Sequence, residues 1–202
     1  MSFALYLITD PSAARVVELT EAALGAAPPG AIAVQARKKG ASARELVELC
    51  RALMPICRAR DAKLLVNDRA DVARVVGADG VHLPERGLSV AEARVVLGAG
   101  ALVGRSCHDR AGLERAQRDG ADLATLGPIG EVEGKGAPLG VEGFAAIVRG
   151  LSIPTYALGG VGEADARALR EAGAAGIAVI RAVYGASDPA RAVRALLHDR
   201  SP

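Results

Sequence analysis

Short runs of apolar, often β-branched residues recur along the chain, and longer segments with a helical spacing of apolar positions separate them. Most of these runs are continuously apolar rather than alternating. That pattern is typical of strands buried on both faces of a parallel sheet. It predicts strands over eight segments: residues 5–10, 31–36, 63–68, 80–83, 102–107, 122–127, 154–159 and 176–181.

The segments between these strands carry helix signals. Ser42 precedes a long amphipathic stretch, and Glu45 three residues later completes a capping box. Four apolar residues then recur at spacings of three and four: Leu46, Leu49, Leu53 and Ile56. Similar start and stop signals occur later in the chain: Ser89 with Glu92, Asp188 with Pro189, and the C-terminal glycines Gly120 and Gly173.

Alternating strands and helices permit an open doubly wound sheet or a closed barrel. No G-x-G-x-x-G motif follows the first predicted strand, which removes the main support for a dinucleotide-binding sheet. Eight strand–helix units favour closure. We therefore predict an α/β protein of one domain, a (β/α)8 TIM barrel over residues 1–202, with no linker or low-complexity segment.

Composition narrows the class of partner. Half of the residues are hydrophobic but only five are aromatic, so the core is expected to consist of Ala, Val, Leu and Ile. A net charge of +2 gives no indication of nucleic acid or a membrane surface as partner. The sequence lacks a long apolar run and a signal peptide, and its cysteines, Cys50 and Cys57 among them, fit core packing in a reducing compartment. We expect a cytoplasmic protein.

Polar residues end almost every predicted strand. In barrels of this kind the chemistry lies at the carboxyl ends of the strands, so these residues are expected to share one rim. They are Thr9 and Asp10, residues 35–39, Asn67 and Asp68, His82, residues 105–108, and Gly159 and Gly160.

Two positions on this rim suggest phosphate. Gln35, Arg37 and Lys39 project to one side if the extended conformation continues, and two cations together favour a phosphate or diphosphate, which Arg37 can bind in a bidentate manner. A solvated basic turn is the alternative. Gly159 and Gly160 allow backbone amides to approach a phosphate, although a tight turn after the strand also needs glycine.

Three further residues are candidates for chemistry. Asp68 is a candidate metal or substrate ligand, but a single carboxylate is a weak Mg²⁺ site. His82 and His108 are each a candidate general acid or base, and a buried histidine satisfied by its neighbours is the alternative for both.

Taken in order, these segments resemble the thiamine phosphate synthase family, which includes a TenI-type thiazole tautomerase branch. The resemblance covers nearly the whole chain and rests on the combination of motifs. They are YLITD (6–10), VQARKK (34–39), LLVNDRADVA (64–73), ADGVHL (78–83), VGRSCH (103–108), GPI (127–129) followed by Lys135, ALGGV (157–161) and AGAAGIAVI (172–180).

The resemblance implies a barrel enzyme of vitamin B1 biosynthesis. In the synthase an aminopyrimidine diphosphate ionises with the help of Mg²⁺, and the nitrogen of a thiazole phosphate captures the cation. The resemblance assigns roles by position: Gln35, Arg37, Lys39, Asn67 and Asp68 to the pyrimidine diphosphate and metal, Ser106 and Lys135 to further substrate contacts, and Gly159 and Gly160 to the thiazole phosphate. It also implies a homo-oligomer.

The chain departs from the synthase pattern at three positions. Gly87 replaces the second metal-binding Asp, and Val132 and Gly134 replace hydroxyl residues that bind phosphate. Glu85 could supply the missing carboxylate if its loop shifted. These losses favour a TenI-like thiazole tautomerase that needs no cofactor, with Mg²⁺ required only in a true synthase.

The chain also departs from the tautomerase pattern, because Pro128 replaces the His of that branch. Proton transfer would then fall to His108, His82, Glu131 or Glu133, and Lys135 also stands as a catalytic candidate. The alternatives are a synthase and a catalytically degenerate binder of thiazole phosphate. Arg181 stands where the family has a small residue, and we expect its guanidinium to reach the phosphate near Gly160.

Overall fold

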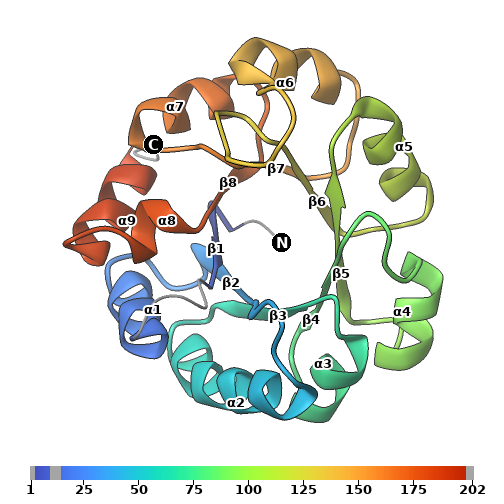
Figure 1. Ribbon diagram of the computed structural model, residues 1–202, viewed down its shortest axis with the longest axis vertical. Helices are drawn as coiled ribbons and strands as arrows, with labels where there is room; N and C mark the ends of the chain where they lie inside the picture. The colour runs from blue at the N-terminus through green and yellow to red at the C-terminus, as the bar shows by residue number, and fades with distance from the viewer. Residues whose placement is uncertain (1–2, 10–14, 199–202) are drawn as a thin grey trace.

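The computed structural model describes residues 3–9 and 15–198, and it is the closed (β/α)8 barrel that the sequence predicts (Figure 1). All neighbouring strands are parallel, and β1 pairs with β8 to close the barrel. The strands are β1 (Leu5–Ile8), β2 (Ile32–Ala36), β3 (Lys63–Asn67), β4 (Gly80–Leu83), β5 (Leu102–Cys107), β6 (Leu123–Leu126), β7 (Thr155–Leu158) and β8 (Gly176–Val179).

The helices form a ring around these strands (Figure 1). They are α1 (Val16–Gly25), α2 (Ala43–Ala59), α3 (Ala70–Val76), α4 (Val90–Leu97), α5 (Arg110–Arg118), α6 (Gly140–Val148), α7 (Glu163–Glu171), α8 (Arg181–Tyr184) and α9 (Pro189–Leu197). A short extra helix, α8, thus separates β8 from α9.

The predicted helix caps are confirmed. Ser42 and Ser89 each accept a hydrogen bond from the backbone N–H of a glutamate three residues later, and both capping boxes are complete. Asp188 caps α9 in the same way, ahead of Pro189. Because these caps satisfy amide groups that have no partner inside the helix, each start is encoded locally, and the sequence can predict it.

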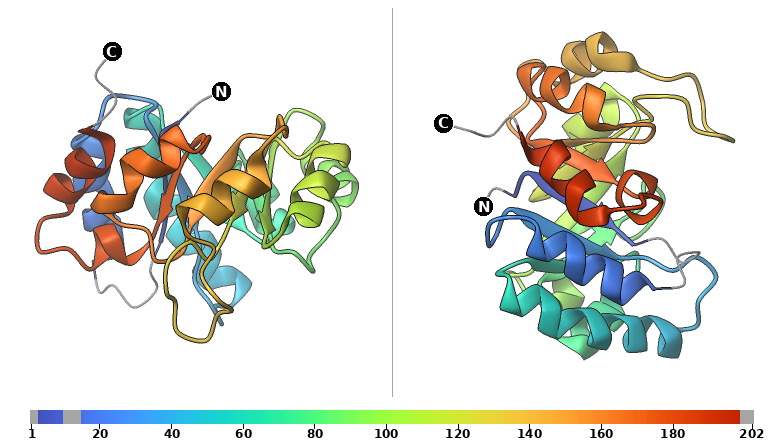
Figure 2. Two further views of the ribbon diagram at one scale, coloured as in Figure 1. Left: turned by 90° about the horizontal axis from the view of Figure 1, so that it is seen from above. Right: turned by 90° about the vertical axis from the view of Figure 1, so that its left-hand side faces the viewer.

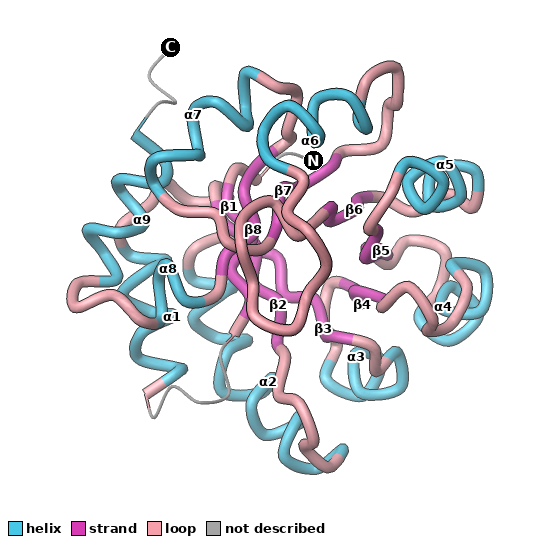
Figure 3. Tube along the Cα trace, turned by 45° about the horizontal axis from the view of Figure 1, so that its top comes forward, coloured by secondary structure: helices cyan, strands magenta, loops and turns pink. Residues whose placement is uncertain are grey.

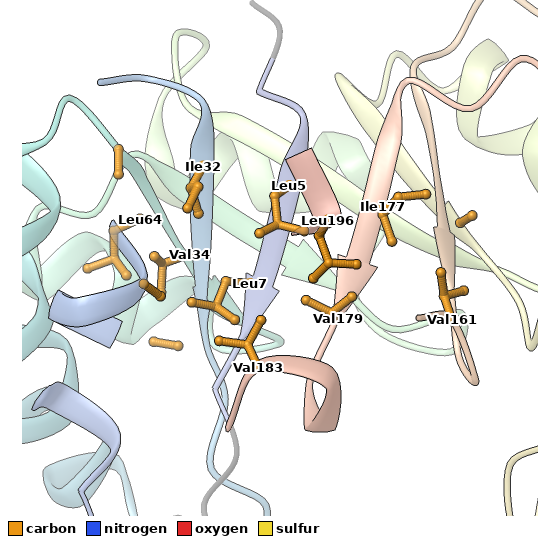
Figure 4. Close-up of a cluster of buried hydrophobic side chains, with 14 of the residues drawn as sticks. Leu5, Leu7, Ile32, Val34, Leu64, Val161, Ile177, Val179, Val183 and Leu196 are labelled. Carbon is orange, nitrogen blue, oxygen red and sulfur yellow. The ribbon is translucent and has the colours of Figure 1, made fainter. Parts of the chain in front are cut away.

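Alternate strand residues point outward and pack under the helices. Figure 4 shows this layer, in which Leu5, Leu7, Val179, Val183 and their neighbours form one aliphatic cluster. Cys50 and Cys57 lie buried in the same cluster as free thiols. Apart from Phe144 and Tyr184, this outer layer has the aliphatic composition that the sequence predicts.

The barrel interior differs from that expectation, because three of the few aromatic residues are concentrated there. Phe3, Tyr6 and Tyr156 pack together, with the rings of Phe3 and Tyr156 stacked 4.7 Å apart. Glycine makes room for rings of this size. A Cβ on Gly176 would lie 2.7 Å from the Tyr156 ring, and a Cβ on Gly104 would lie 2.4 Å from Nδ1 of His82.

Among the described residues, no helix is long and apolar enough to cross a membrane.

Candidate active site

The candidate residues follow the carboxyl ends of the strands. Since all strands are parallel and the barrel is closed, these ends form a single rim. Figure 3 shows the loops that leave the strands at this rim, and Figure 2 shows that the loop between β6 and α6 projects furthest from the barrel. Asp10 lies outside the described residues.

The first part of the site joins β1 to the loop after β2. The buried Thr9 hydroxyl donates to the Arg37 carbonyl oxygen at 2.7 Å and accepts from the Arg37 amide at 2.8 Å. Inside the barrel, the Gln35 side-chain amide donates to the Tyr6 hydroxyl at 3.1 Å. Gln35 and Arg37 are therefore both fixed by groups on or directly after β1, through the parallel pairing of β1 with β2.

The prediction that Gln35, Arg37 and Lys39 share one extended face is wrong for Lys39. β2 ends at Ala36, and the chain then turns through Gly40, which has a φ of +73°. Lys39 is exposed on this turn, and its neighbour Lys38 pairs with Glu45 at 3.0 Å. The two-residue period stops because the strand loses its ladder partner here.

Asp68 occupies an unusual backbone conformation directly after β3. Its φ of +64° lies in the left-handed region, which few residues other than glycine adopt, and such conformations cluster at functional sites. Its amide donates to the carbonyl oxygen of His82 at 2.9 Å. The carboxylate is exposed, and Asn67 before it is half-buried.

Gly87 lies directly against this carboxylate. A Cβ built on Gly87 would be 3.1 Å from Oδ1 of Asp68 and 2.9 Å from Cδ of Pro84. An aspartate at position 87 would therefore begin beside Asp68. In this chain that second carboxylate is missing, and the described residues contain no group of three or more His, Cys, Asp or Glu that could hold a metal ion.

Glu85 does not fill the gap. Its carboxylate lies 3.8 Å from the Arg115 guanidinium, and the two side chains line a small cavity on the outer side of β5. The Arg105 guanidinium holds the same loop by donating to the carbonyl oxygens of Glu85 and Leu88. The donor set thus does not fit a Mg²⁺ ion held by the protein alone, because such an ion needs more oxygens than Asp68 offers.

His82 lies inside the barrel, below the rim, and is only 2% exposed. Its Nε2 is 3.1 Å from the Ser106 hydroxyl and 3.4 Å from the Thr125 hydroxyl. Burial, and secondarily the charge of Arg105, lowers the pKa of His82 to about 3. Because a ring that stays neutral at neutral pH is a poor proton donor, the lowered pKa disfavours a general-acid role among the acid, base and buried-histidine alternatives for His82.

His108 is exposed at the end of β5 and is oriented by a hydrogen bond. Its Nδ1 lies 2.7 Å from the carbonyl oxygen of Gly127. A carbonyl oxygen only accepts, so Nδ1 carries the proton, and the lone pair of a neutral ring is on Nε2. A neutral His108 ring can therefore accept a proton on Nε2, as a general base must.

The loop after β6 packs against the glycines after β7. The amides of Ile129 and Gly130 donate to the Gly159 carbonyl oxygen at 3.0 and 2.8 Å, and a Cβ on Gly160 would lie 2.6 Å from the carbonyl carbon of Gly130. A methyl group of Val132 lies 3.4 Å from the position of a Cβ on Gly159. The two glycines thus have a structural reason as well as the predicted phosphate role.

Among residues 3–9 and 15–198, several cations on the rim have no ion-pair or hydrogen-bond partner for their side chains, and two of these cations are Lys135 and Arg181. Lys135 is exposed on the projecting loop after β6, and Arg181 is exposed at the first position of α8. Arg181 does not pair with a carboxylate of the helical ring, so it remains available to an anion.

Thr9, which holds Arg37, is among the rim residues that the sequence predicts, but Tyr6, whose hydroxyl accepts the hydrogen bond from Gln35, is not. The contact of Tyr6 with Gln35 could be predicted from its position, because side chains that point inward from adjacent strands can contact each other. Finding it requires the register, in which Tyr6 pairs with Ala33, one inward position below Gln35.

The fold and rim define a (β/α)8 barrel with polar groups at the carboxyl ends of its strands. A family model described as thiamine monophosphate synthase matches residues 5–183, so the chain belongs to the thiamine monophosphate synthase family.

Individual proteins match over nearly the whole chain. A protein of Geobacter sulfurreducens named "Putative thiamine-phosphate synthase" is 44% identical over 200 residues, which cover 98% of this chain and 94% of that protein. The thiamine-phosphate synthase of Chlorobium luteolum is 41% identical over 196 residues, covering 96% and 91%. The solved thiamine phosphate pyrophosphorylase of Pyrococcus furiosus is 35% identical with a TM-score of 0.88, covering 97% of this chain and 94% of that one.

Proposed function

We propose that this protein is a thiamine-phosphate synthase, which joins an aminopyrimidine diphosphate to a thiazole phosphate. The observation that carries the proposal is the similarity, over more than nine-tenths of the chain, to proteins that bear this name. The sequence alone favoured a TenI-like tautomerase. The relatives described above support the synthase alternative instead, and Pro128 in place of the tautomerase histidine agrees with them.

In the proposed reaction the carbon–oxygen bond between the pyrimidine methylene and the diphosphate breaks. Both electrons leave with the diphosphate, and the thiazole nitrogen supplies the pair that forms the new carbon–nitrogen bond. Cations and hydrogen-bond donors near the leaving group stabilise its charge. Arg37, Lys135 and Ser106 are the groups that we assign to this task, with Gln35 and Asn67 holding the pyrimidine.

Because Asp68 alone offers few oxygen ligands, we expect the protein by itself to bind Mg²⁺ weakly. A diphosphate can supply the oxygens that the protein lacks, so Mg²⁺ is expected to bind with the diphosphate and not before it. Calorimetry should therefore detect no Mg²⁺ binding to the protein alone, and turnover should rise as Mg²⁺ is titrated into the substrate mixture.

The Glu85→Gln variant tests the alternative that Glu85 supplies the second metal-binding carboxylate. Because the Glu85 carboxylate lies beside Arg115 and is half-exposed, its removal is expected to leave the Mg²⁺ dependence of turnover unchanged. If turnover were lost in this variant, the loop would have supplied the second carboxylate, and our description of the metal dependence would be overturned.

The thiazole tautomerase is the second candidate, and the geometry of His108 favours it. A base with its lone pair on Nε2 suits the proton transfer that aromatises a thiazole carboxylate phosphate, and the reaction needs no metal. The deciding experiment assays the purified protein with both thiazole isomers, with and without the pyrimidine diphosphate and Mg²⁺. Coupling supports the synthase, isomerisation alone supports the tautomerase, and binding without turnover supports a degenerate binder.

Replacing Arg181 with alanine tests the phosphate end of the site. If its guanidinium contacts the thiazole phosphate, the KM for that substrate should rise roughly tenfold, as expected for one charge-assisted hydrogen bond, with little change in kcat. Arg191→Ala is the matched control, since Arg191 lies on α9, beyond α8. Equal KM values for the two variants would contradict the assignment.

A further inference from the structure

The His82 ring sits in a slot that determines which of its nitrogens can form hydrogen bonds. β4 and β5 are in a register that places His82 beside Gly104, and Nδ1 faces the Cα of that glycine. Nδ1 is buried and has no hydrogen-bond partner among the described residues. The other nitrogen, Nε2, faces the hydroxyl groups of Ser106 on β5 and Thr125 on β6.

The two neutral forms of the ring differ in what they leave unpaired. With the proton on Nδ1, a buried N–H would point at a C–H group, and buried N–H groups without an acceptor are rare in proteins. With the proton on Nε2, the unpaired group is a lone pair on Nδ1, which a Gly104 C–H can face favourably. The second form is therefore the more stable one in this slot.

The position of the proton on the His82 ring determines whether Ser106 can donate a hydrogen bond to a ligand. When the Nε2–H of His82 donates to the Ser106 oxygen, the Ser106 proton cannot return to that nitrogen. In the other form, Ser106 would donate to Nε2 and present only lone pairs to a ligand. No other protein acceptor for this hydroxyl occurs in the described part of the chain, and Ser106 lies half-buried at the rim end of β5.

We propose that His82 is a positioning residue, held as the Nε2–H form by its slot beside Gly104, which makes Ser106 a hydrogen-bond donor to the substrate. The substrate atom facing Ser106 is then an acceptor, a diphosphate oxygen or a ring nitrogen. The statement about the substrate rests on the proposed synthase function, whereas the statement about the ring does not.

Nitrogen-15 NMR of protein labelled at histidine tests the form of the ring directly. Histidine occurs three times, and the exposed His108 and His198 are assigned with His108→Gln and His198→Gln variants. The remaining imidazole should show the pattern of couplings and shifts of a ring protonated on Nε2. A ring protonated on Nδ1 would overturn the proposal, whatever reaction the protein catalyses.

A double-mutant cycle measured on kcat/KM tests whether His82 acts on the substrate through Ser106. Ser106→Ala and His82→Leu should each lower kcat/KM roughly tenfold, the scale of one hydrogen bond, and the double variant should fall no further than Ser106→Ala alone. His82→Gln, whose amide can donate from a similar place, should recover most of the loss. Thr155→Val, which removes a buried hydroxyl at the first position of β7, away from the rim, is the matched control and should be near wild type.

The outcomes that contradict the proposal are distinct. Additive losses in the double variant would mean that His82 acts independently of Ser106. Loss of thermal stability in His82→Leu with no recovery of activity in a stable His82→Gln variant would indicate a packing role. If the wild-type protein had no synthase turnover, the proposed function would fail, and the NMR result alone would decide the form of the ring.

Discussion

Asp68→Asn is expected to lower kcat/KM for thiamine phosphate formation about 10²–10³-fold, the usual effect of losing one charged group that stabilises a transition state. Asp68 is the carboxylate at the end of β3, and position 87 offers no second one. Its loss therefore removes the protein's share of any Mg²⁺–diphosphate contact. Asparagine tolerates the left-handed conformation at this position, so stability should change little.

Asp71→Asn is the matched control. Asp71 is an exposed carboxylate in the first turn of α3, and its partner Arg69 lowers its pKa through a hydrogen bond and charge. Its removal should leave kcat/KM within a few-fold of wild type. Steady-state kinetics and thermal unfolding of both variants give the measurement, and equal activity in the two would contradict the role of Asp68.

Gly160→Ala is also expected to have a large effect, and its direct effect is to lower the stability of the fold. Its Cβ would lie 2.6 Å from the carbonyl carbon of Gly130 and 2.7 Å from its Cα, and the φ of +68° is strained for alanine. Backbone atoms cannot turn aside as a flexible side chain can. We expect a free energy of unfolding lower by about 2–4 kcal/mol, from conformational strain and overpacking together.

Gly77→Ala provides the comparison for conformational strain alone, because Gly77 has a φ of +66° and open space around its Cβ position. Gly160→Ala should have the lower melting temperature and should also weaken thiazole phosphate binding, since the loop after β6 must move. If the two variants unfolded at the same temperature, the close contact with Gly130 would not contribute to stability.

Local sequence signals encode the order of the elements, their caps and, through them, the shared rim. Continuous apolar runs encode strands buried on both faces, and Ser42 with Glu45 encodes a helix start through contacts within a few residues. The rim followed from these elements, because parallel strands in a closed barrel all end on the same side. Arg37, Asp68 and Ser106 are therefore predicted from the sequence alone to lie on this rim, where the structure places them.

Which groups these side chains contact depends on packing between distant parts of the chain. The sequence does not indicate that β2 stops before Lys39 or that Glu85 turns toward Arg115. It also cannot distinguish His82, buried beside Gly104, from His108, exposed at the end of β5. Each of these outcomes depends on the register of neighbouring strands and on packing between segments distant in sequence, and such contacts form only in the folded chain.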